Sequence, residues 1–235
     1  MSVDAPAASN GTTTKSKGKG KGDEPAAPAA PIEITRIGTE TLIVPIVGTT
    51  PLIVSRFSEK ARHAMLAPQI GERPPKQKRD PNAEFEAAQY RLDDGGYGMP
   101  AVAFKKATVG AARYYGKSLT MRELRQMLFI KGERSKQDGQ QLVRIESEPP
   151  TMREDVVRLA GQSRSADLRY RPEFTEWTAT LEVIYVTSAL SQGSVLSLIT
   201  AGGFGVGVGE WRPEREGEFG TYEIVDESKV ESIRG

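Results

Sequence analysis

The sequence contains no cysteine and a single histidine, His63. Without thiols the chain cannot form disulfides, thiolate zinc sites, iron–sulfur clusters or cysteine nucleophiles, and one histidine cannot build a multi-histidine metal centre. We therefore expect no cofactor and no metal. Long apolar runs are also missing, since no stretch approaches the roughly 20 residues of a membrane span, and the N-terminus lacks the apolar core of a secretory signal. The expectation is a soluble, cytoplasmic protein with no membrane partner.

Aromatic and larger apolar side chains are nearly absent from residues 1–31, where Ala, Pro, Gly, Ser, Thr and Lys predominate. Such a segment cannot bury enough surface to offset its ordering entropy. The sequence therefore predicts a disordered tail over 1–31 and one α+β domain over 32–235. A lysine stands at every second residue from Lys15 to Lys21. These lysines suit either an arm that binds phosphate or a solubilising leader, and both readings stay open.

Charge is balanced overall, with a net charge of +1, but it is unevenly distributed. Between Lys105 and Lys136 nine basic residues face two acidic ones, a net charge of +7. Between Glu210 and Glu231 eight acidic residues face three basic ones, a net charge of −5. A basic block in a neutral domain can gather a polyanion, although it can equally be an ordinary solvated helix surface.

Local signals divide the domain into a helical first half and a strand-rich second half. An apolar, β-branched run predicts a strand over 41–47, and Pro45 within it indicates a sheet edge or a bulge. Capping and spacing predict four helices, over 58–67, 81–90, 103–115 and 121–129. The second half predicts strands over 142–145, 155–159, 167–171, 175–187 and 219–225, and a helix over 191–201.

The strand over 175–187 has the clearest pattern. Trp177, Ala179, Leu181, Val183 and Tyr185 alternate with polar residues and so share one face. The helix and strand that follow make a β–α–β unit, which favours an α+β or α/β sandwich.

Two apparent phosphate-binding motifs fail on spacing. The glycine run from Gly203 to Gly209 places Val208 where a dinucleotide fingerprint needs its third small residue, and the run leaves a helix instead of opening one. Gly116-Lys117-Ser118 lacks the first glycine of a phosphate-binding loop, because Ala111 stands there. No nucleophile motif accompanies His63. We therefore expect no enzymatic activity.

Alternate glycines allow close approach of a ligand to the backbone. Trp211, Arg212 and Arg215 stand just beyond the run. An indole and a guanidinium beside an open glycine ribbon are typical of single-stranded nucleic-acid binding. The alternative is a mobile or tightly packed loop with Trp211 in the core. The predicted ribbon positions are Gly203, Gly205, Gly207 and Gly209.

Two stretches resemble the RAMP (repeat-associated mysterious protein) superfamily of CRISPR-associated proteins. The run from Gly98 to Ala107, continuing to Arg113, is similar to a family segment in which a proline and small residues lead into a helix with an early lysine and a later arginine. The helix from Ser191 with its glycine run resembles the glycine-rich loop after the family's last helix.

This resemblance implies a ferredoxin-like or RRM-like antiparallel sheet with helices on one face, which binds RNA or single-stranded DNA. It carries over Lys105, Lys106, Arg113 and the glycine loop as binding positions. The chain departs from the nuclease members because His63 precedes both motifs. Plain binding is therefore favoured over an endoribonuclease, which is the third hypothesis.

The segments 167–177 and 208–213 also resemble uncharacterised proteins of tailed actinobacterial phages. That likeness implies the cytoplasm of the host cell and names no activity. The leading hypothesis is a non-enzymatic protein whose partner is single-stranded RNA or DNA. The second is a phage structural or assembly protein that self-associates as a homo-oligomer through strand edges.

Overall fold

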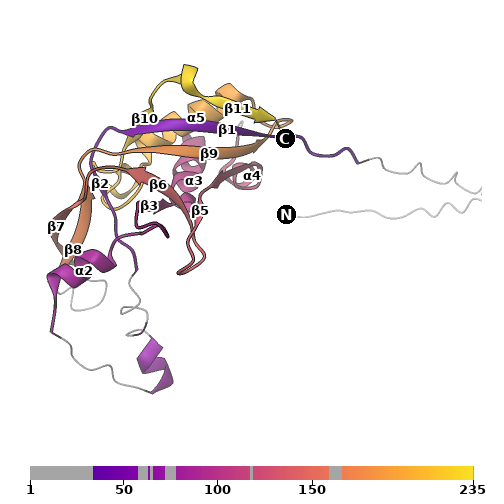
Figure 1. Cartoon of the computed structure of the whole chain (residues 1–235). Coiled ribbons are helices and arrows are strands. Elements are labelled where there is room, and N and C mark those ends of the chain that lie inside the picture. Colours follow the sequence, from indigo (N-terminus) through magenta and orange to yellow (C-terminus); the bar gives the residue numbers. More distant parts are fainter. Residues whose placement is uncertain are drawn as a thin grey trace, which may run out of the picture. The chain divides into compact units, whose positions relative to one another are not determined.

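The computed structural model describes residues 34–57, 63, 66–71, 78–116, 119–158 and 166–234 (Figure 1). The chain divides into two units, Met1–Arg36 and Ile37–Gly235, and every described helix and strand belongs to the second. The predicted tail, its lysines and most of the helix predicted over 58–67 lie outside the described residues.

The second unit is an α+β fold whose described part contains four α-helices and two antiparallel sheets. The helices are α2 (Pro81–Ala87), α3 (Ala101–Gly110), α4 (Met121–Met127) and α5 (Gln192–Gly205). The strands are β1 (Thr39–Gly48), β2 (Leu52–Ile53), β3 (Tyr97–Pro100), β4 (Leu128–Lys131), β5 (Glu133–Arg134), β6 (Gln141–Glu146), β7 (Thr151–Arg158), β8 (Ala166–Phe174), β9 (Thr178–Val186), β10 (Tyr222–Ile224) and β11 (Glu231–Arg234). None of the helices in this described part has the length and apolarity that a membrane crossing requires.

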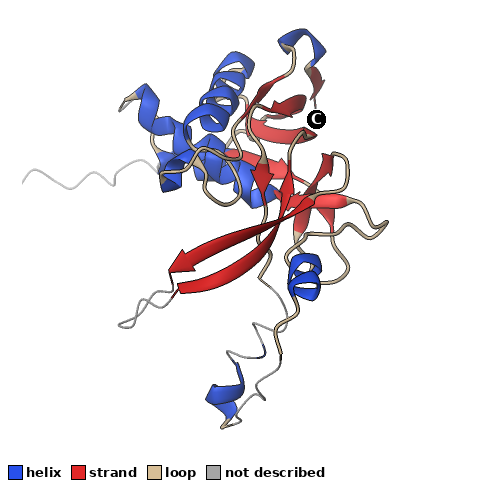
Figure 2. Ribbon diagram, turned by 90° about the vertical axis from the view of Figure 1, so that its left-hand side faces the viewer, coloured by secondary structure: helices blue, strands red, loops and turns tan. Residues whose placement is uncertain are grey.

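The larger sheet has the order β10-β1-β9-β6-β3, with β4 also paired to β9 and β11 to β1. β1 and β9 pair along almost their whole length, with Leu42 opposite Val183 and Val44 opposite Leu181. These side chains are fully buried, because they alternate toward the face that α3 and α5 cover. Both views place the two helices on the same side of the sheet (Figures 1 and 2).

The alternating pattern predicted before and along β9 is confirmed. Trp177, Ala179, Leu181, Val183 and Tyr185 are all at most 3% exposed. The indole N–H of Trp177 donates to a loop carbonyl at 3.0 Å, which satisfies its polar atom inside the core.

Pro45 does not lie at an edge or a bulge, as its residue type predicted. β1 is an inner strand, and its register with β9 runs without a break through Pro45, opposite Thr180. On the other side Pro45 falls between the segments paired to β10 and β11, where its carbonyl accepts from the Val225 N–H at 3.0 Å. Because a strand residue directs its N–H and C=O to the same side, the missing donor of Pro45 faces this gap in the ladder.

The helix predicted over 191–201 begins as expected and ends later. Ser191 caps α5 by accepting from the Ser194 N–H, and Val195, Leu196, Leu198 and Ile199 are buried. α5 then continues through both glycines that were predicted to stop it, as far as Gly205. The reason is packing, since a side chain at Gly202 would approach the Ala107 carbonyl of α3 to 2.7 Å.

The helix predicted over 103–115 begins earlier, at Ala101, and continues as a 3-10 helix to Tyr115, so its predicted end at Gly116 is confirmed. Two other helices begin where predicted and end earlier. Asp80 and Pro81 begin α2, and the capping box of Thr120 and Glu123 begins α4, as predicted. α4 ends at Met127, however, because Leu128–Lys131 pairs with β9 as strand β4. Phe129 therefore belongs to a strand and not to the end of a helix. Long-range pairing overrides local helix propensity here.

The smaller sheet has the order β2-β8-β7. β7 and β8 pair over eight consecutive positions and form a long hairpin that projects from the rest of the unit (Figure 2). β2 pairs with β8 only at Leu52 and Ile53, and α2 packs along the remainder of β8. β7 is thus an outer strand of this sheet, as is the two-residue β2 at the other edge.

The close contact between α5 and β10 predicts a strong effect of Gly203→Ala. The added methyl group would lie 2.1 Å from the backbone carbonyl oxygen of Tyr222, which cannot move without displacing β10. We expect a loss of about 1–3 kcal/mol in the free energy of unfolding, as in other overpacked cores. Urea titration measures this loss.

Gly193→Ala, in the same helix, is the matched control. Nothing lies within 4 Å of a methyl group at that position. Alanine there should stabilise the protein by up to about 1 kcal/mol. Equal effects of the two substitutions would contradict the packing role of Gly203.

Candidate nucleic-acid interface

The glycine segment after α5 is packed into the protein. Val206, Gly207 and Val208 are buried. The N–H groups of Val206 and Gly207 donate to the carbonyl of Gly202 at 3.1 and 2.9 Å, and the N–H of Val208 donates to a neighbouring loop at 2.9 Å. The expectation of an open ribbon that offers these donors to phosphate is therefore wrong, because the protein itself uses them.

The first two glycines of the predicted ribbon accommodate tyrosine side chains. A methyl group at Gly203 would meet Tyr222, and one at Gly205 would lie 2.1 Å from the Tyr114 hydroxyl. That hydroxyl donates to the Gly205 carbonyl at 3.2 Å. The absence of side chains at Gly203 and Gly205 is thus explained by contacts within the protein.

The last two glycines lie beside α3, where the structure forms a pocket of about 220 Å³. Gly207 and Gly209 both have positive φ, 69° and 79°, which a residue with a side chain rarely adopts. The turns they make bring the segment against the first two turns of α3. The lining residues are Ser55, Tyr90, Met99, Pro100, Val102, Ala103, Lys106, Ala107, Val206, Gly207, Val208, Gly209, Glu210, Arg212 and Glu214.

Four of the nine predicted site residues meet in this pocket, namely Lys106, Gly207, Gly209 and Arg212. Lys106 is exposed and makes no ion pair or hydrogen bond with the described residues. Arg212 is held in place by the Gly209 carbonyl at 2.9 Å and by the Glu214 carboxylate at 2.8 Å. The pocket therefore combines one free cation with one that is already paired.

Arg113 lies close to the pocket but not in its lining. Its guanidinium donates to the Gly110 carbonyl at 3.0 Å and forms an ion pair with Glu214 at 3.6 Å. Both oxygens of the Glu214 carboxylate are thus engaged by arginines, since Arg212 contacts the other one. Arg113 helps to neutralise an acidic residue at the rim of the pocket.

Trp211 is exposed and has strained backbone geometry. Its φ is 53°. The residue is 41% exposed, so the alternative interpretation of the sequence, which placed Trp211 in the core, is wrong. A bulky residue in this left-handed region costs about 1–3 kcal/mol, and such strain concentrates at functional sites. Its carbonyl accepts from the Phe219 N–H at 3.0 Å, which fixes the turn. Its two chain neighbours, Glu210 and Arg212, line the pocket.

Lys105 lines a second pocket, which also lies at the N-terminal end of α3. Its ammonium donates to the Arg125 carbonyl at 2.9 Å and lies 4.0 Å from the centroid of the Phe129 ring. Burial lowers the pKa of Lys105. This largely apolar pocket shares Tyr90, Pro100 and Val102 with the first one. The two pockets therefore adjoin around the start of α3.

The basic block does not form a single unpaired surface. Lys131 pairs with Glu182 at 2.7 Å, and Lys136 pairs with Asp93 at 3.5 Å. Lys117 lies outside the described residues. The exposed members without an ion pair in the described part of the chain are Lys106, Arg122, Arg125 and Arg134. Arg113, Lys131 and Lys136 are paired with carboxylates distant in the sequence, whereas Lys105 contacts a backbone carbonyl and the Phe129 ring.

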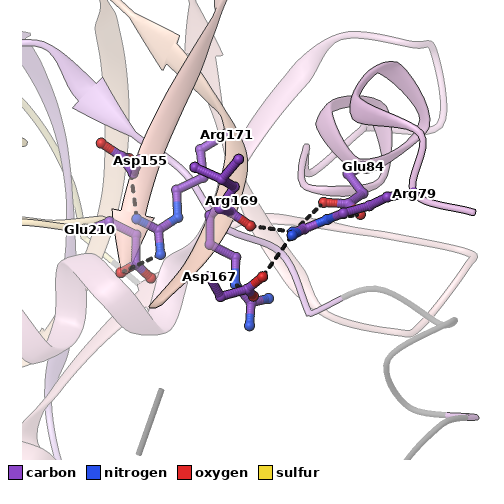
Figure 3. A network of polar contacts seen from close by, with 8 residues as sticks. Arg79, Glu84, Asp155, Asp167, Arg169, Arg171 and Glu210 are labelled. Atoms are coloured by element: carbon purple, nitrogen blue, oxygen red, sulfur yellow. Dashed lines mark hydrogen bonds and ion pairs between the residues drawn. The ribbon is translucent and has the colours of Figure 1, made fainter. Parts of the chain in front are cut away.

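A polar network ties the pocket to the hairpin (Figure 3). Arg171 of β8 contacts Asp155 at 3.3 Å and Glu210 at 3.9 Å. The Arg171 and Asp155 side chains are only 11% and 9% exposed, and Arg153 adds a second contact to Asp155 at 2.8 Å. The Glu210 N–H donates to Ile53 at 2.9 Å, so this residue is held by both its backbone and its side chain.

Sequence reasoning missed Tyr90 and Glu210 as pocket residues. Tyr90 is half-buried, and burial raises the pKa of its hydroxyl, with a smaller effect in the same direction from Glu210. The sequence did contain an indication of Glu210, because this residue directly follows the glycine run and begins the acidic segment. Tyr90 follows α2 and gave no signal.

His63 is exposed, and the structure places no catalytic partner against it among the described residues. Within the same residues no group of three or more His, Cys, Asp or Glu side chains is placed to hold a metal ion.

Removal of the Arg171 guanidinium by Arg171→Met should destabilise the protein. The variant leaves the buried Asp155 with Arg153 as its remaining ion-pair partner in the described network. We expect a loss of about 1–3 kcal/mol in the free energy of unfolding, measured by urea titration. In a double-mutant cycle with Asp155→Asn the two losses should not add.

Arg169→Met is the matched control, on the same strand. Its side chain is 48% exposed and pairs with Asp167 at the surface. We expect a change of at most about 1 kcal/mol. If Arg169→Met were as destabilising as Arg171→Met, the network would have no special role.

No family of known proteins matches this chain, and no curated protein matches it either. The resemblance to the RAMP superfamily therefore stays a prediction, and the function has to follow from the residues of the pocket.

Proposed function

We propose that this protein binds single-stranded RNA or DNA without cleaving it, by seating one unpaired base in the pocket beside α3. The observation that carries this proposal is the arrangement of that pocket. A free ammonium from Lys106, the fixed guanidinium of Arg212 and an apolar floor lie together, and the exposed Trp211 stands next to them.

The floor and the rim suit the two parts of a nucleotide. The lining includes apolar side chains, among them the exposed Val102 and the edge of Met99, which suit the faces of a planar base. Lys106 stands at the rim, where a phosphate would remain in contact with water. Trp211 offers a ring on which a neighbouring base can stack.

The size of the pocket supports a single base as its occupant. Its volume is about 220 Å³, below the range of about 300–1,000 Å³ that is usual for pockets that enclose drug-sized ligands. A complete dinucleotide cofactor would not fit. A nucleic-acid strand that places one base in the pocket and runs over the surface needs only this smaller volume.

The adjoining pocket is the surface over which the bound nucleic-acid strand would continue. Phe129 is 47% exposed, and Lys105 lies over its ring. Val102, 54% exposed, is common to both pockets. Lys105 contacts the Arg125 carbonyl of α4, and Arg122 and Arg125 of that helix are exposed. Aromatic and basic side chains in alternation are typical of surfaces that bind single strands.

We further propose that the domain is ferredoxin-like. In chain order, β1, α3, β4, β9, α5 and β10 follow a β-α-β-β-α-β sequence, and β10, β1, β9 and β4 are antiparallel neighbours in that order. This order supports the fold that the RAMP resemblance implies. The segments between β1 and α3 and between β4 and β9 would be insertions.

Binding to a labelled single-stranded oligonucleotide should weaken steeply with salt, because phosphate contacts release counterions. Lys106→Ala should weaken binding to all sequences alike and reduce the slope of log K against log salt by about 0.7, the loss of one contact on a single strand. Fluorescence anisotropy at several salt concentrations measures both quantities.

Lys229→Ala is the control, since Lys229 is exposed and lies outside both pockets. It should leave the slope unchanged. Absence of binding at low salt would refute the proposal, and an equal effect of the two lysine variants would refute this location.

Trp211→Gly separates a binding role from a structural one. Glycine adopts the φ of 53° freely, so stability should stay within about 1 kcal/mol of the wild type. Loss of one stacked base, worth about 1–3 kcal/mol, should weaken oligonucleotide binding roughly tenfold. A large loss of stability with unchanged affinity would show instead that Trp211 is structural.

Self-association is the second candidate function, and β7 is the observation that favours it. This strand has no partner on its outer side among the described residues, and Val156 on it is 67% exposed. Outer strands of this kind can pair with another chain. A defined oligomer in sedimentation, together with no affinity for oligonucleotides, would favour an assembly protein over the proposal above.

A further inference from the structure

The pocket beside α3 contains one carboxylate with unused acceptor capacity. Glu214 is engaged on both oxygens by Arg212 and Arg113. Glu210, in contrast, makes no hydrogen bond through its carboxylate within the described residues, and its ion pair with Arg171 is long, at 3.9 Å on one oxygen. Its side chain is 44% exposed and lines the pocket.

The backbone of Glu210 is fixed, and a mostly buried arginine lies near its partly exposed carboxylate. Its N–H donates to Ile53 at 2.9 Å. Arg171, which is only 11% exposed and is anchored by Asp155, lies on the far side of the carboxylate. The fixed backbone reduces the freedom that Glu210 loses when a ligand binds, which favours selectivity.

The chemistry of a carboxylate restricts which base it accepts. An ionised carboxylate accepts hydrogen bonds and donates none. The pairing edge of guanine carries two adjacent donors, N1–H and the 2-amino group, which match the two oxygens. Uracil and thymine offer one N–H between two carbonyl oxygens, and those oxygens would face the negative charge. Adenine and cytosine offer one amino group each.

Tyr90 supplies a complementary donor on the same pocket. Its hydroxyl is protonated at neutral pH, since the ordinary pKa of tyrosine is about 10, and burial raises this pKa further. It can therefore donate to an acceptor such as guanine O6, which lies next to N1–H. Lys106 remains available for phosphate.

We propose that this pocket selects guanine from a single strand, with Glu210 as the residue that determines specificity and Tyr90 as its support. The inference rests on the proposed function, since it names the base that the pocket prefers. Hydrogen bonds to a charged acceptor are roughly twice as strong as neutral ones, which makes the carboxylate the main source of the preference.

The test compares three oligonucleotides of equal length in anisotropy titrations with the full chain: oligouridine, oligouridine with one central guanosine, and the same strand with inosine at that position. Inosine lacks only the 2-amino group. Wild-type protein should bind the guanosine strand about tenfold tighter than oligouridine, as a bidentate base contact does, with inosine in between.

Glu210→Gln should reduce the preference for guanosine over oligouridine to about twofold or less, because a neutral amide offers a single acceptor oxygen. Glu218→Gln is the control, since it removes the same charge from an exposed position outside the pocket, and it should retain the full preference. Tyr90→Phe, a second variant, should lower the preference in part. Urea titration verifies that each variant is folded.

The outcomes separate the two proposals. If the wild type binds all three strands equally, or if Glu210→Gln keeps the full preference, the specificity inference is wrong and strand binding stands. If none of the strands binds at low salt, both proposals are wrong. A preference for guanosine that disappears in Glu210→Gln and persists in Glu218→Gln supports both.

Discussion

The close approach of α5 to α3 and β10 is the contact on which the rest of the structure depends. At Gly202 and Gly203 the helix backbone lies against the Ala107 carbonyl and against Tyr222, at distances that leave no room for a side chain. This approach positions the segment that leaves α5 along α3. The pocket floor, with Ala107 on one side and Val206 and Val208 on the other, is a direct result.

Part of the fold could be predicted because its causes are local. Alternation along β9 identified a buried face, and the caps at Asp80, Thr120 and Ser191 begin helices as their side chains dictate. A cap or an alternating strand is decided by residues within a few positions of one another. Such signals identify the starts of elements better than their ends.

The rest depends on partners far away in the sequence. A run of glycines is equally compatible with an open loop and with close packing of backbones, and only the positions of Ala107 and Tyr222 decide for packing. Pro45 likewise fits an inner strand because two separate strands leave a gap beside it. The lysine partners Glu182 and Asp93 could not be identified from composition.

The candidate site likewise combines residues that could be predicted from the sequence with residues that could not. Arg212 was predicted from the residue types just after the glycine run and Lys106 from the resemblance to the RAMP superfamily, whereas Tyr90 and the adjoining pocket follow from tertiary structure alone. The left-handed backbone conformation of Trp211 is explained neither by burial of its side chain nor by a helix cap, and strain of this kind is typical of functional sites.

The most direct measurement for the central claim is photo-crosslinking of the protein to a single strand that contains 4-thiouridine, followed by identification of the crosslinked peptides. The account predicts crosslinks at Trp211, the exposed indole next to Arg212 in the chain, and at Tyr90, which lines the pocket. Crosslinks confined to β7 and β8, or their complete absence at low salt, would contradict it.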